Sequence, residues 1–97
     1  MTLTGYETQV LRLLAGSTEP IGTFDVPDRL QRQPVPDIDA PDEDPVRAAW
    51  TEERLGLVES LIALCDKGLA DVAVRADGEN GDRFVVTEAG RVFLAQQ

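Results

Sequence analysis

The stretch Leu64-Cys-Asp-Lys-Gly-Leu69 predicts the point at which a helix ends and a sheet begins. Gly68 stands where a left-handed backbone often closes a helix, and glycine adopts that backbone without a steric penalty. Leu64 and Leu69 then form the apolar pair that accompanies such a stop. Upstream, Asp44-Pro45 is typical of a helix start, with the aspartate as N-cap. The two signals predict a long helix between them.

This helix is expected to bury one apolar face and to expose the other. Residues at helical spacing predict a core-facing side: Leu55, Val58, Leu61, Ile62 and Cys65. The outer face would then carry Glu52, Glu53, Gly56, Glu59, Ser60, Ala63 and Asp66. Thr51 resembles a second N-cap, so we expect a break or kink near Trp50. Trp50 itself either closes the core over a long loop or lines a pocket or a dimer interface.

The residues after Leu69 predict a β-hairpin and a final helix. Segments 71–75 and 83–87 alternate apolar with polar or small side chains, which is typical of half-buried strands. Between them, residues 76–82 hold an Asp-Gly and an Asn-Gly pair, both characteristic of tight turns. Thr87 is the expected N-cap of a helix that runs from Glu88 to about Ala95.

The N-terminal segment predicts another helix, followed by an irregular region. Thr4 and Glu7 have the spacing of a capping box, and Gly16 is a plausible end of that helix. Residues 17–44 contain five prolines, with room for one short helix over about 26–33. The run Pro34–Asp44 reads as an extended acidic loop, which is long for a compact domain and therefore either functional or mobile.

The second half of the chain, mainly residues 51–95, resembles a winged helix-turn-helix of the MarR type and related small bacterial or archaeal regulators. The resemblance rests on the Gly68-Leu69 exit of the long helix and on Val86-Thr87, Gly90-Arg91 and Leu94. It implies a single α+β domain over residues 1–97, mostly helical, with a two-stranded wing. Residues 17–44 depart from the family pattern and are interpreted as an irregular, acidic, proline-rich insertion. The resemblance also implies a homodimer formed through the terminal helices.

Charge weighs against nonspecific binding to nucleic acid. The chain has 9 basic and 18 acidic residues, a net charge of −9, and residues 34–44 contribute five acids and no base. Such a chain repels phosphates, so DNA is disfavoured without being excluded, and anionic membranes are disfavoured too. No apolar stretch approaches the roughly 20 residues of a membrane span.

The sequence offers no constellation for catalysis. There is no histidine, and Cys65 is the only cysteine, so neither a histidine-based triad nor an internal disulfide can form. We expect no enzyme activity, no metal and no cofactor. A cytoplasmic location fits this cysteine usage and the absence of a signal peptide at the N-terminus. Cys65 is expected to be a small buried hydrophobe rather than a redox sensor.

Two functions therefore stay open for a regulatory binding module. As a small transcription regulator, it would hold phosphates with Arg47, Arg54, Arg75 and Arg83, while Glu53, Gly56 and Ser60 face the bases. As a protein-binding winged helix, it would meet a basic partner with Asp37, Asp39, Asp42 and Glu43 and with the acidic outer face of the long helix.

Three of these segments also have purely structural interpretations. The acidic loop is a solvated segment unless it binds a hard cation, meets a basic partner or mimics phosphates. The turn at 77–82 is a polar hairpin turn rather than a calcium loop. Arg75 and Arg83 either clamp a phosphate or pair with Asp71, Asp77 or Asp82.

The expected core is Leu11, Leu14, Leu55, Val58, Leu61, Ile62, Leu69, Val72, Phe84, Val86 and Phe93.

Overall fold

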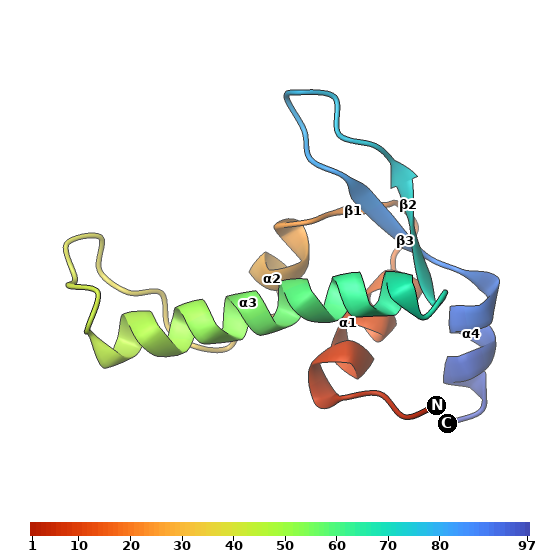
Figure 1. Ribbon diagram of the computed structural model, residues 1–97, viewed down its shortest axis with the longest axis horizontal. Helices are drawn as coiled ribbons and strands as arrows, with labels where there is room; N and C mark the ends of the chain where they lie inside the picture. Colours follow the sequence, from red (N-terminus) through yellow and green to blue (C-terminus); the bar gives the residue numbers. More distant parts are fainter.

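The computed structural model describes all residues, 1–97, as an α+β arrangement of four helices and one small antiparallel sheet (Figure 1). This confirms the α+β class that the sequence predicts. Along the chain the elements are α1 (Gly5–Ala15), β1 (Ile21–Gly22), α2 (Asp25–Leu30), α3 (Pro45–Asp66), β2 (Ala70–Val74), β3 (Arg83–Val86) and α4 (Glu88–Ala95).

Both helix starts predicted from Thr4 and Thr87 are confirmed. The Thr4 hydroxyl accepts from the Glu7 amide at 3.1 Å, and the Glu7 carboxylate accepts from the Thr4 amide at 2.9 Å. The Thr87 hydroxyl accepts from the Gly90 amide at 3.1 Å at the start of α4. These side chains satisfy amides that have no partner within the first turn of a helix.

The predicted end of α3 is confirmed in its hydrogen bonds. The Leu69 amide donates to the Leu64 carbonyl and the Gly68 amide donates to the Cys65 carbonyl, each at 3.0 Å. Gly68 has a φ of 77°, which explains the glycine at this position. The chain therefore turns directly from α3 into β2.

The sheet has a third strand that the two-stranded prediction missed. β3 lies in the centre, pairing with β2 on one side and with the two-residue β1 on the other. Ile21 pairs with Phe84, and both side chains are buried. A two-residue strand has no alternation to read, so only this long-range pairing reveals it.

The core is built from every element except α4, which packs against its edge. Its buried side chains are Val10, Leu11, Leu14, Ile21, Val26, Leu57, Leu61, Leu64, Leu69, Ala70 and Phe84. Gly90 brings α4 close to the sheet, because a Cβ there would overlap the Leu69 carbonyl oxygen and lie 2.7 Å from Val86 Cγ2. Of the expected core, Val58, Val72, Val86 and Phe93 are half-buried.

The predicted core face of α3 is confirmed at Leu61, which is fully buried, and is wrong at Leu55 and Ile62. Leu55 and Ile62 are 57% and 54% exposed, whereas Leu57 and Leu64 are buried. The reason lies at Gly56, where α1 approaches so closely that a Cβ would lie 2.6 Å from the Tyr6 ring. Docking of α1 on that side rotates the Leu57 side of α3 inward.

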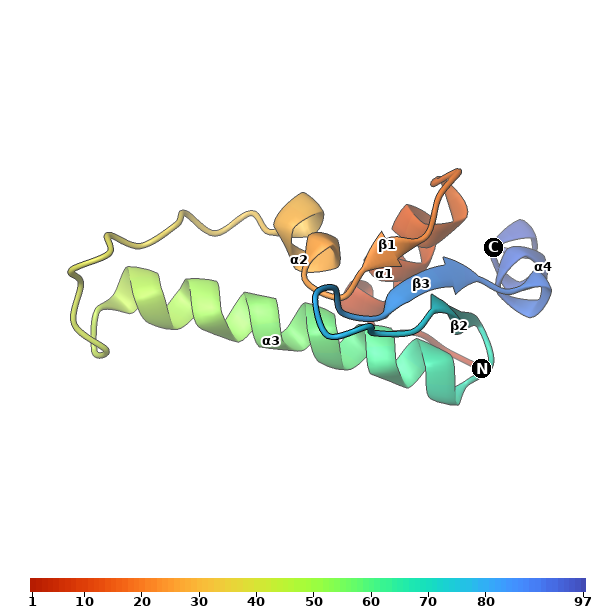
Figure 2. The same cartoon turned by 90° about the horizontal axis from the view of Figure 1, so that it is seen from above.

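The predicted break near Trp50 is also wrong, since α3 runs without interruption from Pro45 to Asp66. Its N-terminal half extends beyond the sheet and α1, and residues 31–44, which we call the arm, run back along it (Figure 2). The short helix α2 ends at Leu30, three residues before the predicted end. The molecule is elongated as a result, measuring 43 × 33 × 21 Å.

Candidate interaction surface

The arm is tied to α3 at both of its ends. At the inner end, Glu53 Oε1 accepts from the backbone amides of Arg32 and Gln33 at 2.9 and 3.1 Å. At the outer end, Arg47 Nε donates to the Ala40 carbonyl at 3.1 Å, and Nη2 donates to the Asp37 carbonyl at 3.0 Å. These bonds use backbone atoms of the arm and do not involve the carboxylates of Asp37, Asp39, Asp42 and Glu43.

The arm presents acidic and apolar side chains to solvent. Its exposed carboxylates are Asp37, Asp39, Asp42 and Glu43, the residues predicted to meet a basic partner. Ile38 and Val35 are 93% and 77% exposed among them. Asp44 instead caps α3 by accepting from the Val46 amide at 3.3 Å. No three carboxylates in the structure gather closely enough to hold a metal ion.

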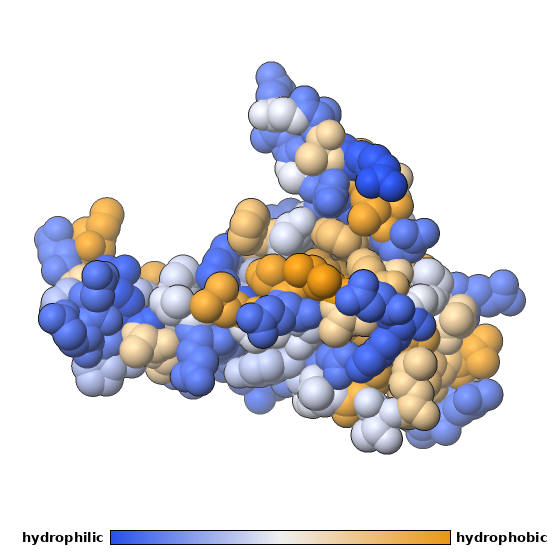
Figure 3. All heavy atoms as spheres, viewed as in Figure 1, coloured by the Kyte–Doolittle hydropathy of each residue, from blue (hydrophilic) through white to orange (hydrophobic).

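The outer face of α3 carries an apolar stripe, which we define as Leu55, Val58, Ile62 and Cys65. Their spacing of three, four and three residues places them on one side of a helix. Leu55 and Ile62 are exposed, while Val58 and Cys65 are half-buried. Figure 3 shows apolar atoms gathered along the middle of α3 with hydrophilic atoms at their border. The sequence predicted that all four would face the core, but Leu55 and Ile62 do not, while Cys65 packs against the core from the border of the stripe.

An acidic row, Glu52, Glu59 and Asp66, follows α3 beside the apolar stripe. The seven-residue intervals place its members on one side of the helix, and all three are exposed. Next to the row lies a cavity of about 480 Å³. Its lining comprises Tyr6, Gln33, Ala49, Glu52, Glu53, Leu55, Gly56 and Glu59, and includes no basic side chain.

Two of the four arginines predicted to hold phosphates are engaged within the protein. Arg54 forms an ion pair with Asp28 at 2.7 Å and donates to Gln31 Oε1 at 2.8 Å. Its guanidinium also lies 5.7 Å from the centroid of the Phe24 ring and 5.2 Å from that of Trp50. Arg47 is occupied by the carbonyls of the arm.

The residues predicted to face DNA bases do not form an exposed set. Glu53 and Ser60 are buried, so their assignment to the outer face is wrong. The Ser60 hydroxyl donates to the Gly56 carbonyl at 2.7 Å within α3. Gly56 itself is covered by the Tyr6 ring. Helical spacing could not separate these residues from Glu52 and Glu59, because the side on which α1 docks is a tertiary property.

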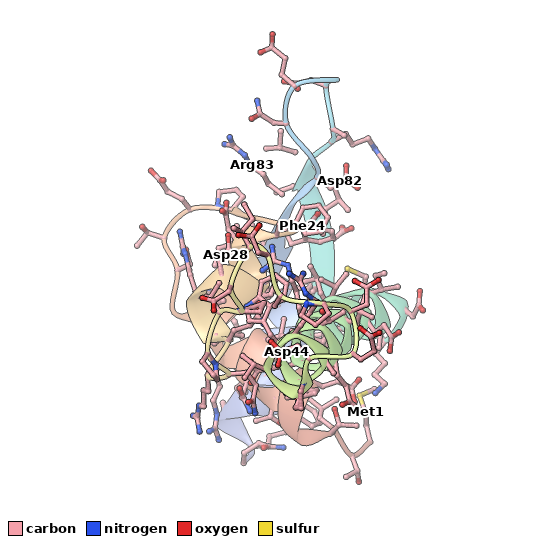
Figure 4. The ribbon with its side chains drawn as sticks, turned by 90° about the vertical axis from the view of Figure 1, so that its left-hand side faces the viewer. Met1, Phe24, Asp28, Asp44, Asp82 and Arg83 are labelled. Carbon is pink, nitrogen blue, oxygen red and sulfur yellow. The ribbon has the colours of Figure 1, made fainter.

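Arg75 and Arg83 are exposed on the β2–β3 hairpin and form no ion pair, so of the two alternatives the one that pairs them with Asp71, Asp77 or Asp82 is not observed. The neighbouring carboxylates serve the turn instead: Asp82 Oδ1 accepts from the Ala76 amide at 2.7 Å. The amides of Asn80 and Glu79 donate to Asp77 and lower the pKa of its carboxyl group. Viewed along α3, Arg83 lies well away from the helix, beyond Phe24 and Asp28 (Figure 4).

Cys65 is half-buried at the end of the apolar stripe. Burial raises the pKa of its thiol, and the nearby charges of Asp71 and Asp66 raise it further. A reactive cysteine needs the opposite, a lowered pKa that produces thiolate at neutral pH. The surroundings of this thiol therefore favour contact with apolar groups over redox chemistry.

No protein-family model, curated protein or solved structure matches this chain. None of the four helices is both long and apolar enough to cross a membrane.

Proposed function

We propose that this chain is a winged-helix regulatory binding module that recognises a protein partner rather than DNA. The order of its elements supports the winged-helix assignment, with α3 leading directly into the β2–β3 hairpin and then α4. Central placement of β3 between β2 and the short β1 supports it too, because the hairpin is thereby anchored to the body.

The composition of the α3 outer face is the observation that carries the choice of partner. A recognition helix places this face in the major groove, where polar and basic groups meet bases and phosphates. Here it carries the apolar stripe and the acidic row. Phosphates would repel the row, and burying Leu55 and Ile62 against polar base edges would gain little. A protein surface suits both features.

DNA binding is the second candidate, because Arg75 and Arg83 are exposed and free of carboxylate partners. Each phosphate neutralised contributes about 0.9 to the slope of log affinity against log salt, so two arginines predict a slope near 2 per chain. Such a footprint is weak beside that of regulators that make many phosphate contacts.

Fluorescence anisotropy separates the two functions. The duplex is the DNA upstream of the protein's own gene, with a scrambled duplex as control, titrated from low to physiological salt. We expect no preference for the native duplex at any salt concentration. A native-sequence preference that weakens linearly in log salt, and that is lost in Arg75→Glu/Arg83→Glu, would establish a DNA-binding regulator and refute the proposal.

A further inference from the structure

We infer that the α3 outer face is a docking site for a basic amphipathic helix of a partner protein. The site consists of the apolar stripe, the acidic row and the adjoining cavity. The inference rests on the proposed function, because it names the class of partner that the module would recognise.

The geometry of the apolar stripe favours a helical partner. Leu55 and Cys65 lie ten residue steps apart along α3, about 15 Å or roughly three turns. Its alternating intervals of three and four residues are those at which two helices interlock their side chains. A partner helix of similar length, with apolar residues at the same intervals, would remove Leu55 and Ile62 from water.

The charges beside the stripe favour a basic partner. Glu52, Glu59 and Asp66 follow one edge, and none of the three takes part in an ion pair. At the C-terminal end of the stripe, Asp66 and Asp71 lie close enough to Cys65 for their charges to raise the pKa of its thiol. The nearest bases are engaged elsewhere, Arg54 by Asp28 and Lys67 by Glu7. Lysine or arginine flanking the apolar side of the partner would supply the missing countercharge.

The cavity beside the row offers a place for one cationic side chain. Glu52, Glu53 and Glu59 line it together with the Tyr6 ring. Both hydrogen bonds accepted by the buried Glu53 fall on Oε1, so none involves Oε2. A lysine or arginine entering here would meet carboxylates and an aromatic ring, which together stabilise a cation.

A designed peptide tests the inference on the full chain. The probe is a fluorescein-labelled 18-residue helix with leucines at three- and four-residue intervals and lysines on its flanks. Two control peptides have the same composition in scrambled order and glutamate in place of lysine. We expect only the first peptide to bind, with an affinity that falls as salt rises. Ile62→Lys should weaken binding by about tenfold or more.

Matched variants show where the peptide binds. Val92→Lys changes a similarly exposed apolar residue of α4 and should leave the affinity unchanged. Glu52→Gln/Glu59→Gln should weaken binding and reduce its salt dependence. The docking site is refuted if the scrambled peptide binds as tightly, or if Ile62→Lys and Val92→Lys have the same effect. Circular dichroism of each variant confirms that the fold is retained.

A second copy of the chain is the competing occupant, and sedimentation of the protein alone tests it. A dimer that Ile62→Lys dissociates would show that the apolar stripes of two protomers pack against each other, and would overturn the inference. The protein-binding function and the docking site on α3 can be refuted independently. Loss of peptide binding without any DNA preference overturns the docking site and leaves the protein-binding function standing. A native-sequence preference in the DNA titration overturns both.

Discussion

At the scale of single residues, Gly90 shows how one missing methyl group positions a helix. Glycine inside an exposed helix costs about 0.5–1 kcal/mol relative to alanine, so Gly→Ala normally stabilises. At Gly90 the added Cβ would overlap the Leu69 carbonyl oxygen. We therefore expect Gly90→Ala to lower the free energy of unfolding by about 1–3 kcal/mol, measured by urea denaturation. Gly5→Ala, where a Cβ meets nothing within 4 Å, is the control and should not destabilise. Equal stability of Gly90→Ala and the parent would show that α4 does not dock here.

Glu7 is a second residue whose role depends on its surroundings. It is buried, forms an ion pair with Lys67 and accepts from the Thr4 amide, and these contacts lower the pKa of its carboxyl group from 4.5. Because the folded-state pKa is lowered, the stabilisation is complete above the unfolded pKa and is lost as pH falls through the folded one. Glu7→Gln can keep the capping contact with Thr4 but removes the charge.

We therefore expect Glu7→Gln to be less stable than the parent at pH 7, with the difference shrinking below pH 4.5. Urea midpoints of both proteins across this range measure the effect. Glu88→Gln, an exposed acid in the first turn of α4, provides the control and should show a much smaller pH-dependent difference. A gap between Glu7→Gln and the parent that stays constant with pH would mean that the charge of Glu7 does not stabilise the fold.

At the scale of elements, local signals predicted most helix ends because capping contacts involve residues two to five positions apart. The Thr4–Glu7 box and the Gly68 stop need no knowledge of the rest of the chain.

The buried face of α3 was not predictable in this way. Leucines and other apolar residues occur on two sides of this helix, and periodicity alone cannot say which side α1 covers. The arginines predicted to hold phosphates were misjudged for the same reason. The sequence shows that Arg54 is present but not that it forms an ion pair with Asp28.

Two adjacent residues test the observed orientation of α3. Leu61 is fully buried, whereas Ile62 is 54% exposed. Leu61→Ala should cost about 2–5 kcal/mol of unfolding free energy because it leaves a cavity in the core. Ile62→Ala should change it by about 0.5 kcal/mol or less, since little buried surface is lost. Chemical denaturation of both variants measures the contrast. Comparable losses of unfolding free energy in the two variants would mean that Ile62 faces the core, as the sequence predicted.

At the scale of the whole molecule, charge is distributed so that the elongated end of α3 is the most acidic region. The arm runs beside this end, with Asp37, Asp39, Asp42 and Glu43 exposed and without a basic partner. Arg47 holds the arm through backbone carbonyls rather than carboxylates, so its binding does not neutralise them. Residues 34–44 contribute −5 of the net charge of −9, and this concentration of charge opposes compaction by self-repulsion, which a basic partner would relieve.

Neutralising the arm should therefore stabilise the protein at low ionic strength. Asp37→Asn/Asp39→Asn/Asp42→Asn/Glu43→Gln makes the net charge less negative, from −9 to −5, and leaves the backbone contacts of Arg47 in place. We expect a higher urea midpoint at about 10 mM salt, where charges interact over roughly 30 Å, and a smaller gain at 150 mM, where they interact over roughly 8 Å. Arg75→Gln/Arg83→Gln makes the charge more negative and should shift the midpoint the other way. If both variants moved the midpoint in the same direction, or if salt left the gain unchanged, local contacts of the arm rather than overall charge would control stability.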